Sequence, residues 1–159
     1  VDVDGRVWGA PTFSDETVYI GTRRGTVYAL AAADGEELWN AEIGDDIRWS
    51  IAVTSDTIYV PDEGSIHAIS TDGDKMWSVN ASNYVFAPTV AGDSVVVTDR
   101  LDAVGLDATT GTERWRHDVQ ERRISDQVYS GIECEPAVHN GIVYVASHAG
   151  DIYALERSR

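Results

Sequence analysis

The sequence predicts an all-β fold, a β-propeller built from repeated four-stranded antiparallel units. Three observations support this prediction. One segment recurs at a fixed spacing, each copy holds short runs of β-branched and aromatic residues, and turn residues separate those runs. The recurring segment ends in a tryptophan, and the intervals from Trp39 to Trp77 and from Trp77 to Trp115 are both 38 residues. A fixed period in this range is typical of repeat proteins.

The first copy, about residues 6–44, contains the whole pattern. Its candidate strands lie at residues 10–13, 18–20, 26–30 and 37–39. Short runs of this composition are typical of strands rather than helices. The turn pairs Arg24-Gly25 and Asp34-Gly35 separate the last three runs. We therefore expect one copy to form four antiparallel strands joined by tight turns.

Three further copies follow, at about residues 45–82, 83–130 and 131–159, and the last is incomplete. Their candidate strands lie at residues 50–53, 58–60, 65–69 and 75–77, then at 87–90, 95–97, 103–106 and 113–115, and finally at 135–138, 142–145 and 152–155. Four antiparallel strands that recur about every 38 to 40 residues are typical of a propeller blade. Residues 1–159 are therefore predicted to form one propeller segment of about four blades.

A glycine and a tryptophan close each of the first three copies. The pairs are Gly35 and Trp39, Gly73 and Trp77, and Gly111 and Trp115. Glycine suits the turn that directs the following strand. Tryptophan buries a large apolar area while its indole N–H still needs a hydrogen-bond partner. We expect these residues to dock each blade against the next.

These segments approximate Ala-Leu-Asp-x-x-Thr-Gly-x-x-x-Trp, which resembles the tryptophan docking motif of the pyrroloquinoline-quinone (PQQ) repeat family. The preceding Ala-Pro-Thr-Val and Val-Tyr-Val elements also match, so the resemblance covers essentially the whole chain. The first copy departs from the motif at Ala31 and Asp34, the second is one residue shorter, and the fourth ends before its glycine and tryptophan. The resemblance implies a ring of blades with the tryptophans wedged between neighbours.

About four copies leave two arrangements open. The favoured one is half of a ring of seven or eight blades. In the other, Val1–Asp4 adds to the last blade as its outer strand and closes a small four-bladed ring. An open half-ring would expose apolar blade faces and unpaired sheet edges, so self-association is expected, with two halves completing one ring.

The charge is strongly negative, with 27 acidic against 12 basic residues and a formal net charge of −15. Such a chain repels nucleic acids and anionic membranes, and no apolar run is long enough for membrane insertion. Lys75 is the one lysine. Abundant carboxylates with almost no lysine resemble proteins of salt-loving microbes and indicate a halophilic archaeon; the alternative is an ordinary acidic surface. Localisation stays open, and an extracytoplasmic or membrane-associated place of the full-length protein fits.

Nothing in the sequence assembles a catalytic or metal site. The four histidines, His67, His117, His139 and His148, lack the two-ligand spacing typical of zinc. The serines show no nucleophile elbow, and the acidic pairs lie in predicted turns without the spacing of a calcium loop. No catalytic residue, metal or cofactor is therefore predicted.

The resemblance implies two classes of function. Catalytic members are quinoprotein dehydrogenases that hold PQQ over calcium near the propeller axis, against a disulfide between adjacent cysteines; Cys134, the one cysteine, cannot form such a bond. Other members serve as assembly scaffolds at membranes or as sensor modules of signalling proteins. We therefore predict a non-catalytic binding or scaffold module with a protein partner, and keep a quinoprotein fragment and a sensor module as alternatives.

Two places are candidate interaction sites. The first is an insertion of about ten residues between Trp115 and Pro136, with four arginines at or near it: Arg114, Arg116, Arg122 and Arg123. Guanidinium groups bind carboxylates or phosphates in bidentate fashion, so an anionic partner is expected there. Alternatively, these arginines neutralise Asp118, Glu121 and Asp126 nearby.

The second place is the entry to each inner strand, which is expected to line one rim of the central channel. It is occupied by Gly9, Trp49, Phe86 and Cys134, with Trp8 alongside. An aromatic ligand or a partner's peptide could stack on these rings. The alternative is that they only pack blade against blade.

Overall fold

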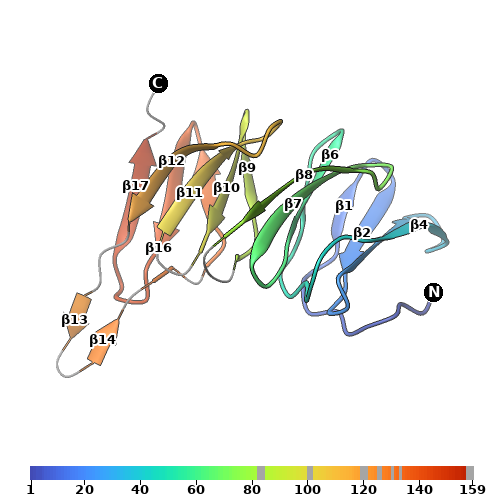
Figure 1. Ribbon diagram of the computed structural model, residues 1–159, viewed down its shortest axis with the longest axis horizontal. Helices are drawn as coiled ribbons and strands as arrows, with labels where there is room; N and C mark the ends of the chain where they lie inside the picture. The colour runs from blue at the N-terminus through green and yellow to red at the C-terminus, as the bar shows by residue number, and fades with distance from the viewer. Residues whose placement is uncertain are drawn as a thin grey trace. The chain divides into compact units, whose positions relative to one another are not determined.

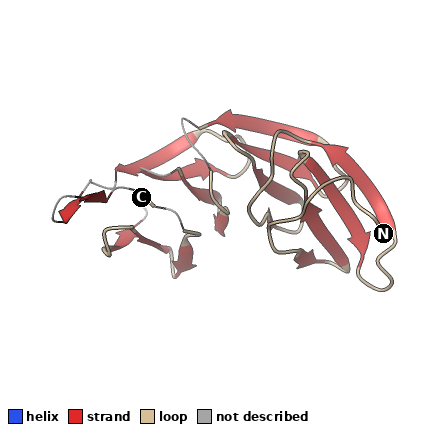
Figure 2. Ribbon diagram, turned by 90° about the horizontal axis from the view of Figure 1, so that it is seen from below, coloured by secondary structure: helices blue, strands red, loops and turns tan. Residues whose placement is uncertain are grey.

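A computed structural model describes residues 1–81, 85–99, 102–118, 122–124, 127–129, 131–132 and 134–156, with the backbone alone for 122–124 and 127–129. Within these ranges every regular element is a β-strand (Figure 2). The chain divides into two compact units, Val1–Ala81 and Ser82–Arg159. The predicted all-β fold of antiparallel four-stranded blades is confirmed.

The first unit contains two complete four-stranded sheets (Figure 1). The strands of the first sheet are β1 (Thr12–Ser14), β2 (Thr17–Gly21), β3 (Thr26–Ala31) and β4 (Glu37–Glu42). Those of the second are β5 (Ala52–Val53), β6 (Thr57–Pro61), β7 (Ser65–Ser70) and β8 (Lys75–Asn80). In both sheets each strand pairs with the next one along the chain, so the sheets are simple antiparallel meanders.

The second unit contains one four-stranded sheet, one hairpin and one three-stranded sheet. The four-stranded sheet consists of β9 (Thr89–Ala91), β10 (Ser94–Thr98), β11 (Asp102–Asp107) and β12 (Glu113–Asp118). The hairpin pairs β13 (Arg122–Ile124) with β14 (Gln127–Tyr129). The last sheet has β15 (Ala137–His139), β16 (Ile142–Ala146) and β17 (Ile152–Glu156). Residues 1–4 form no strand, and β17 pairs only with β16 among the described strands.

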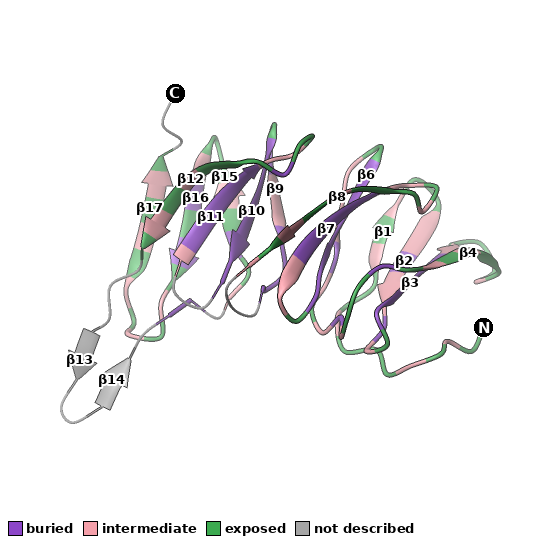
Figure 3. Cartoon of the chain, viewed as in Figure 1, coloured by how far each residue is buried: buried purple, intermediate pink, exposed green. Residues whose placement is uncertain are grey.

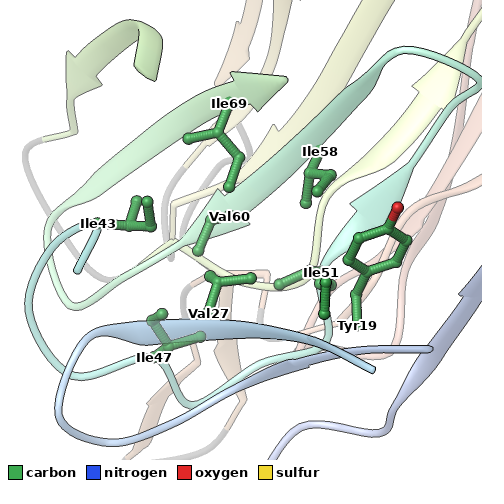
Figure 4. Close-up of a cluster of buried hydrophobic side chains, with 9 residues drawn as sticks. Tyr19, Val27, Ile43, Ile47, Ile51, Ile58, Val60 and Ile69 are labelled. Atoms are coloured by element: carbon green, nitrogen blue, oxygen red, sulfur yellow. The ribbon is translucent and has the colours of Figure 1, made fainter. Parts of the chain in front are cut away.

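The middle strands of the blades form the core, and the outer strands face solvent (Figure 3). Residues of β6 and β10 are buried along their whole length, whereas β4, β8 and β12 share one alternation of exposed and half-buried positions. Figure 4 shows the core of the first unit, where aliphatic side chains pack with the ring of Tyr19. Burial on both faces explains why these strands read as continuous apolar runs.

The three predicted turn glycines adopt the left-handed conformation that favours glycine. Their φ angles are +75° for Gly35, +93° for Gly73 and +72° for Gly111. The backbone N–H groups of Gly35 and Gly111 donate to carbonyls four residues earlier, at 2.8 Å in both cases. A non-glycine residue would be strained in this geometry, and each turn begins the outer strand that carries the tryptophan.

Candidate functional site

Trp39 lies against the neighbouring blade of the first unit. Its indole Nε1 donates a 3.0 Å hydrogen bond to the carbonyl of Thr71, in the turn before β8. A Cβ atom placed on Gly73 would lie 3.2 Å from the indole ring, and the ring of Tyr19 is 6.1 Å away, centroid to centroid. Trp39 thus spans from the β4 edge of one blade to the closing turn of the next.

The other two repeat tryptophans pack within their own blades in part by the same contacts. Trp77 lies 6.0 Å from the ring of Tyr59, as Trp39 does from Tyr19. The indole of Trp115 covers Gly105 so closely that a Cβ atom there would overlap the ring. Among the described residues, Trp115 Nε1 is the buried side-chain nitrogen or oxygen without a hydrogen-bond partner.

Arg114, the first arginine of the predicted basic site, is held by acidic groups of its own blade. Its Nη1 is 2.5 Å from Asp93, and its Nη2 is 2.5 Å from Asp107. It also donates to Ser94 Oγ at 3.2 Å. The hydrogen bonds from Arg114, then those from the Thr110 backbone, lower the pKa of Asp107 to about 2. The guanidinium therefore bridges β10, β11 and the turn between β9 and β10.

Arg116 is paired in the same way. It forms ion pairs with Asp102 and with Glu113, the latter at 2.8 Å, and the hydrogen bonds with Glu113 and Asp102 raise its pKa. These partners belong to β11 and β12, and differ from the nearby acids that the sequence suggested. The side chains of Arg122 and Arg123 lie outside the described residues. The anion site around these arginines stays a prediction.

Two of the predicted rim residues lie in the second unit and contribute to packing there. Phe86 is buried, with 6% of its surface exposed. Cys134 is half-buried; its carbonyl accepts a hydrogen bond from Thr98 Oγ1 at 2.9 Å, and its Sγ lies 3.3 Å from the carbonyl of Ala146.

The two aromatic rim residues of the first unit are exposed and come from adjacent segments. Trp8 is 59% exposed and Trp49 is 39% exposed. A Cβ atom on Gly9 would lie 2.6 Å from the carbonyl group of Trp49, so only glycine allows this approach. The backbone N–H of Ala10 donates to Ser50 Oγ at 3.1 Å. These contacts fix residues 8–10 beside residues 48–50.

The ring of Trp8 packs against two arginines that belong to an ion-pair network. The guanidinium carbon of Arg23 is 4.3 Å from the ring centroid of Trp8, and that of Arg48 is 6.0 Å away, a cation–π arrangement. Both arginines bond to Asp46, Arg23 at 2.6 to 3.0 Å and Arg48 at 2.9 to 3.0 Å. The hydrogen bonds from Arg23 lower the pKa of Asp46 despite partial burial. Asp46 therefore holds two cations under one exposed aromatic ring.

An open hollow of about 510 Å³ adjoins this network and shares Arg23 with it. It is lined by Val3, Asp4, Gly5, Arg6, Arg23 and Arg24. Among the described residues, the exposed guanidinium groups of Arg6 and Arg24 form no ion pair or hydrogen bond. We call the six residues Arg6, Trp8, Arg23, Arg24, Arg48 and Trp49 the Trp8 surface.

The hollow has a fixed wall because Asp4 is fastened to the β2–β3 turn. Its carboxylate accepts hydrogen bonds from Thr22 at 3.1 Å and Thr26 at 2.9 Å, and its N–H donates to the hydroxyl of Tyr28 at 3.1 Å. Partial burial opposes ionisation, but the bonds from Thr26, Thr22 and Tyr28 lower the pKa of Asp4. The backbone of Arg6 accepts a further bond from the N–H of Arg23 at 2.9 Å.

Sequence reasoning pointed to Trp8 and Trp49 but missed the four arginines beside them. A signal was present: residues 1–81 contain five basic residues, Arg6, Arg23, Arg24, Arg48 and Lys75, and Arg48 directly precedes Trp49. The turn between β2 and β3 brings Arg23 and Arg24 to the same end of the unit as residues 6–8. Their convergence depends on tertiary contacts that no spacing reveals.

The described residues do not fit a PQQ–calcium group. No cluster of three or more His, Cys, Asp or Glu side chains in the described ranges could hold a metal ion. The single Cys134 offers no adjacent cysteine for the disulfide implied by the quinoprotein resemblance.

Nor does the described part of the chain contain a helix with the length and apolarity needed to cross a membrane.

Curated relatives are mainly assembly factors. The chain is 26% identical over 118 residues to the outer membrane protein assembly factor BamB of Burkholderia pseudomallei, covering 71% of this chain and 30% of that protein. It is 25% identical over 161 residues to BamB of Yersinia pestis, covering 93% and 40%. It is 36% identical over 121 residues to the serine/threonine-protein kinase AfsK of Streptomyces griseus, covering 67% and 15%. The chain thus spans well under half the length of these relatives.

Solved structures share the fold at low sequence identity. BamB from Moraxella catarrhalis superposes with a TM-score of 0.83 at 22% identity, covering 98% of this chain and 51% of that one. The computationally designed Ika4 protein superposes with a TM-score of 0.83 at 14% sequence identity, covering 98% of this chain and 93% of that one. A quinohemoprotein alcohol dehydrogenase from Pseudomonas putida superposes with a TM-score of 0.76 at 21% sequence identity, covering 98% of this chain and 33% of that one.

The family model described as outer membrane protein assembly factor BamB matches residues 2–159. The match takes in all four predicted repeats, so the chain belongs to this family of PQQ-like propeller repeats.

Proposed function

We propose that this chain is part of a non-catalytic scaffold that binds a protein partner through the Trp8 surface. One observation carries the proposal: an exposed tryptophan is held on a network of arginines and Asp46 beside an open, arginine-lined hollow. Aromatic and arginine side chains on a rigid support are the residues that dominate protein interfaces. Membership of the BamB family supports a scaffold over an enzyme.

The proposal concerns protein binding and not a particular assembly. The relatives named assembly factors are more than twice as long as the matched part of this chain. We infer that the full-length protein works outside the cytoplasm or at a membrane, as the names of these relatives suggest. The similarity to AfsK supports a sensor module as the second candidate, since that relative is a kinase and this chain covers 15% of it.

We also infer a salt-adapted source. The excess of carboxylates over basic residues supports a hydrated acidic surface, and Lys75 is the one lysine. A halophilic archaeal protein should gain thermal stability between low and molar potassium chloride. A mesophilic acidic protein should change less, because repulsion between surface charges farther apart than about 8 Å is already largely screened at physiological ionic strength.

Photocrosslinking in the producing organism tests partner binding. A photoreactive phenylalanine analogue replaces Trp8 in the full-length protein, and Phe13, which is 66% exposed and lies on β1, serves as the matched control site. We expect a covalent adduct with a defined protein from position 8 and none from position 13. Equal labelling at both positions, or none at either, would contradict the scaffold proposal.

The enzyme alternative and self-association are tested on one purified sample. Light scattering in high salt gives the mass, and a dimer would support a second copy as a partner. PQQ and calcium are then titrated while thermal stability and quinone absorbance are followed. We expect neither to change; saturable stabilisation by PQQ with calcium would favour the quinoprotein alternative.

A further inference from the structure

We infer that the hollow lined by Arg6 and Arg24 binds carboxylates of an acidic partner segment whose neighbouring aromatic or aliphatic side chain packs on Trp8. This inference rests on the proposed function and specifies the chemistry of the partner. The distribution of charge supports it. Four of the five basic residues in residues 1–81 belong to the Trp8 surface, although the same range contains fifteen acidic residues.

The cations of this surface divide into two pairs with different roles. Arg23 and Arg48 share Asp46, Arg48 also lies 3.8 Å from a carboxylate oxygen of Glu63, and both arginines support the ring of Trp8, so their charge is largely compensated. Arg6 and Arg24 are exposed and form no ion pair with any described residue. Guanidinium groups left unpaired in an acidic protein are available for bidentate bonds with an incoming carboxylate.

The one acidic group that lines the hollow is already engaged. Both oxygens of Asp4 accept hydrogen bonds from threonines, one from Thr22 and one from Thr26. Asp4 therefore stays ionised and fixed at the wall; the charge of Arg24 also lowers its pKa, without a direct ion pair between the two side chains. Its negative charge still lies at the wall of the hollow, which disfavours a dianion such as phosphate more than a single carboxylate.

The apolar part of the site is the exposed face of Trp8, with Val7 beside it in sequence. Val7 is 39% exposed. A hollow of about 510 Å³ is much larger than one phosphate and adjoins the ring through Arg23. A short peptide with carboxylates around an apolar residue matches this combination, whereas a nucleic acid would meet the strongly negative remainder of the protein.

A labelled peptide, Glu-Glu-Phe-Glu-Glu, tests the inference by fluorescence anisotropy at the lowest salt concentration at which thermal unfolding shows the protein to be folded, since charges act over about 10 Å at about 0.1 M and over less at higher salt. We expect saturable binding, weakened at about 1 M salt. The combined Arg6→Ala and Arg24→Ala variant should weaken binding about tenfold to a hundredfold, the effect of losing one or two charge-assisted bonds. Lys75→Ala, which removes the fifth basic residue, should leave affinity unchanged.

A second peptide and a second variant separate the contributions of the peptide's carboxylates and of the planar guanidinium groups. The peptide Gln-Gln-Phe-Gln-Gln should not bind, because it lacks carboxylates. Arg6→Lys with Arg24→Lys keeps the charge but loses the planar fork, and should give intermediate affinity. Thermal unfolding confirms that each variant folds; because both arginines are exposed and unpaired among the described residues, we expect no loss of stability.

Three results would overturn the inference: no binding of the acidic peptide to the unmodified protein, equal binding by the double alanine variant, or displacement of the peptide by millimolar inorganic phosphate. The third would identify a phosphate site instead. The scaffold proposal can hold even if this inference fails. If the crosslinked partner persists in the double alanine variant, the scaffold stands and only the role of Arg6 and Arg24 is wrong.

Discussion

The substitution Trp39→Ala tests whether the repeat tryptophans carry the stability of the fold. The indole is half-buried against Tyr19, Gly73 and the core of the first unit. Removing roughly 150 Å² of buried apolar surface at about 25 cal/mol per Å² costs about 4 kcal/mol. Loss of the hydrogen bond to Thr71 adds about 1 kcal/mol, and partial exposure of the ring reduces the sum. We expect the free energy of unfolding to fall by about 3 to 5 kcal/mol.

Urea denaturation in high salt measures this change, and two neighbouring substitutions calibrate it. Trp39→Phe keeps an aromatic ring but removes the indole N–H, and should cost about 1 to 2 kcal/mol. Leu38→Ala alters the adjacent residue of β4, which is 55% exposed, and should stay within about 0.5 kcal/mol. If Trp39→Ala were no more destabilising than Leu38→Ala, the tryptophan would not hold the two blades together, and the docking argument would fail.

Two further predictions concern the buried pair Asp62 and His67. The Nε2 of His67 donates a 2.9 Å hydrogen bond to the carboxylate of Asp62. A Cβ atom on Gly44 would overlap Asp62 and lie 2.7 Å from His67 Nε2, so Gly44→Ala should lower the free energy of unfolding by about 1 to 3 kcal/mol. Gly64 has open space at its Cβ position, so Gly64→Ala should lower it much less. Equal urea midpoints for the two variants would refute this prediction. Burial alone would raise the pKa of Asp62, but the bonds from His67 and from backbone N–H groups outweigh it and lower the pKa to about 2. The resulting stabilisation, about 2 kcal/mol, is present above about pH 4 and is lost as the pH falls toward about 2. The variant Asp62→Asn should lose less stability over this interval, and an identical acid profile would refute the assignment.

The fold could be predicted from sequence because its determinants are local and repeated. The glycine before each tryptophan needs a left-handed turn, and the observed φ angles of Gly35, Gly73 and Gly111 have that sign. Alternating strand residues between such turns allow only short antiparallel pairs. Even so, the insertion after β12 was expected only as a longer connection, and part of it forms the β13–β14 hairpin.

The candidate sites were harder to predict because equivalent positions differ in their surroundings. Trp49 and Phe86 occupy the same register position, yet Trp49 is 39% exposed and Phe86 is 6% exposed. In the pairing of β11 with β12, Glu113 lies opposite Leu106 and Trp115 lies opposite Gly105. Arg114 lies between these two pairs, and its guanidinium contacts Asp107. Which acid an arginine meets depends on strand pairing across the sheet, and sequence distance alone suggested other partners.

The arginines of the two units show why local pairing matters more than the number of cations. Arg114 and Arg116 lie on an outer strand whose neighbours supply several carboxylates, so they stabilise their own blade first. Arg6 and Arg24 lie beside a turn where Asp4, the acidic residue that lines the same hollow, already accepts hydrogen bonds from two threonines. A partner that binds Arg114 must displace existing ion pairs, whereas Arg6 and Arg24 form no ion pair with any described residue that a partner would have to break. In a chain with this excess of acid, an anionic segment should therefore bind first at the Trp8 surface.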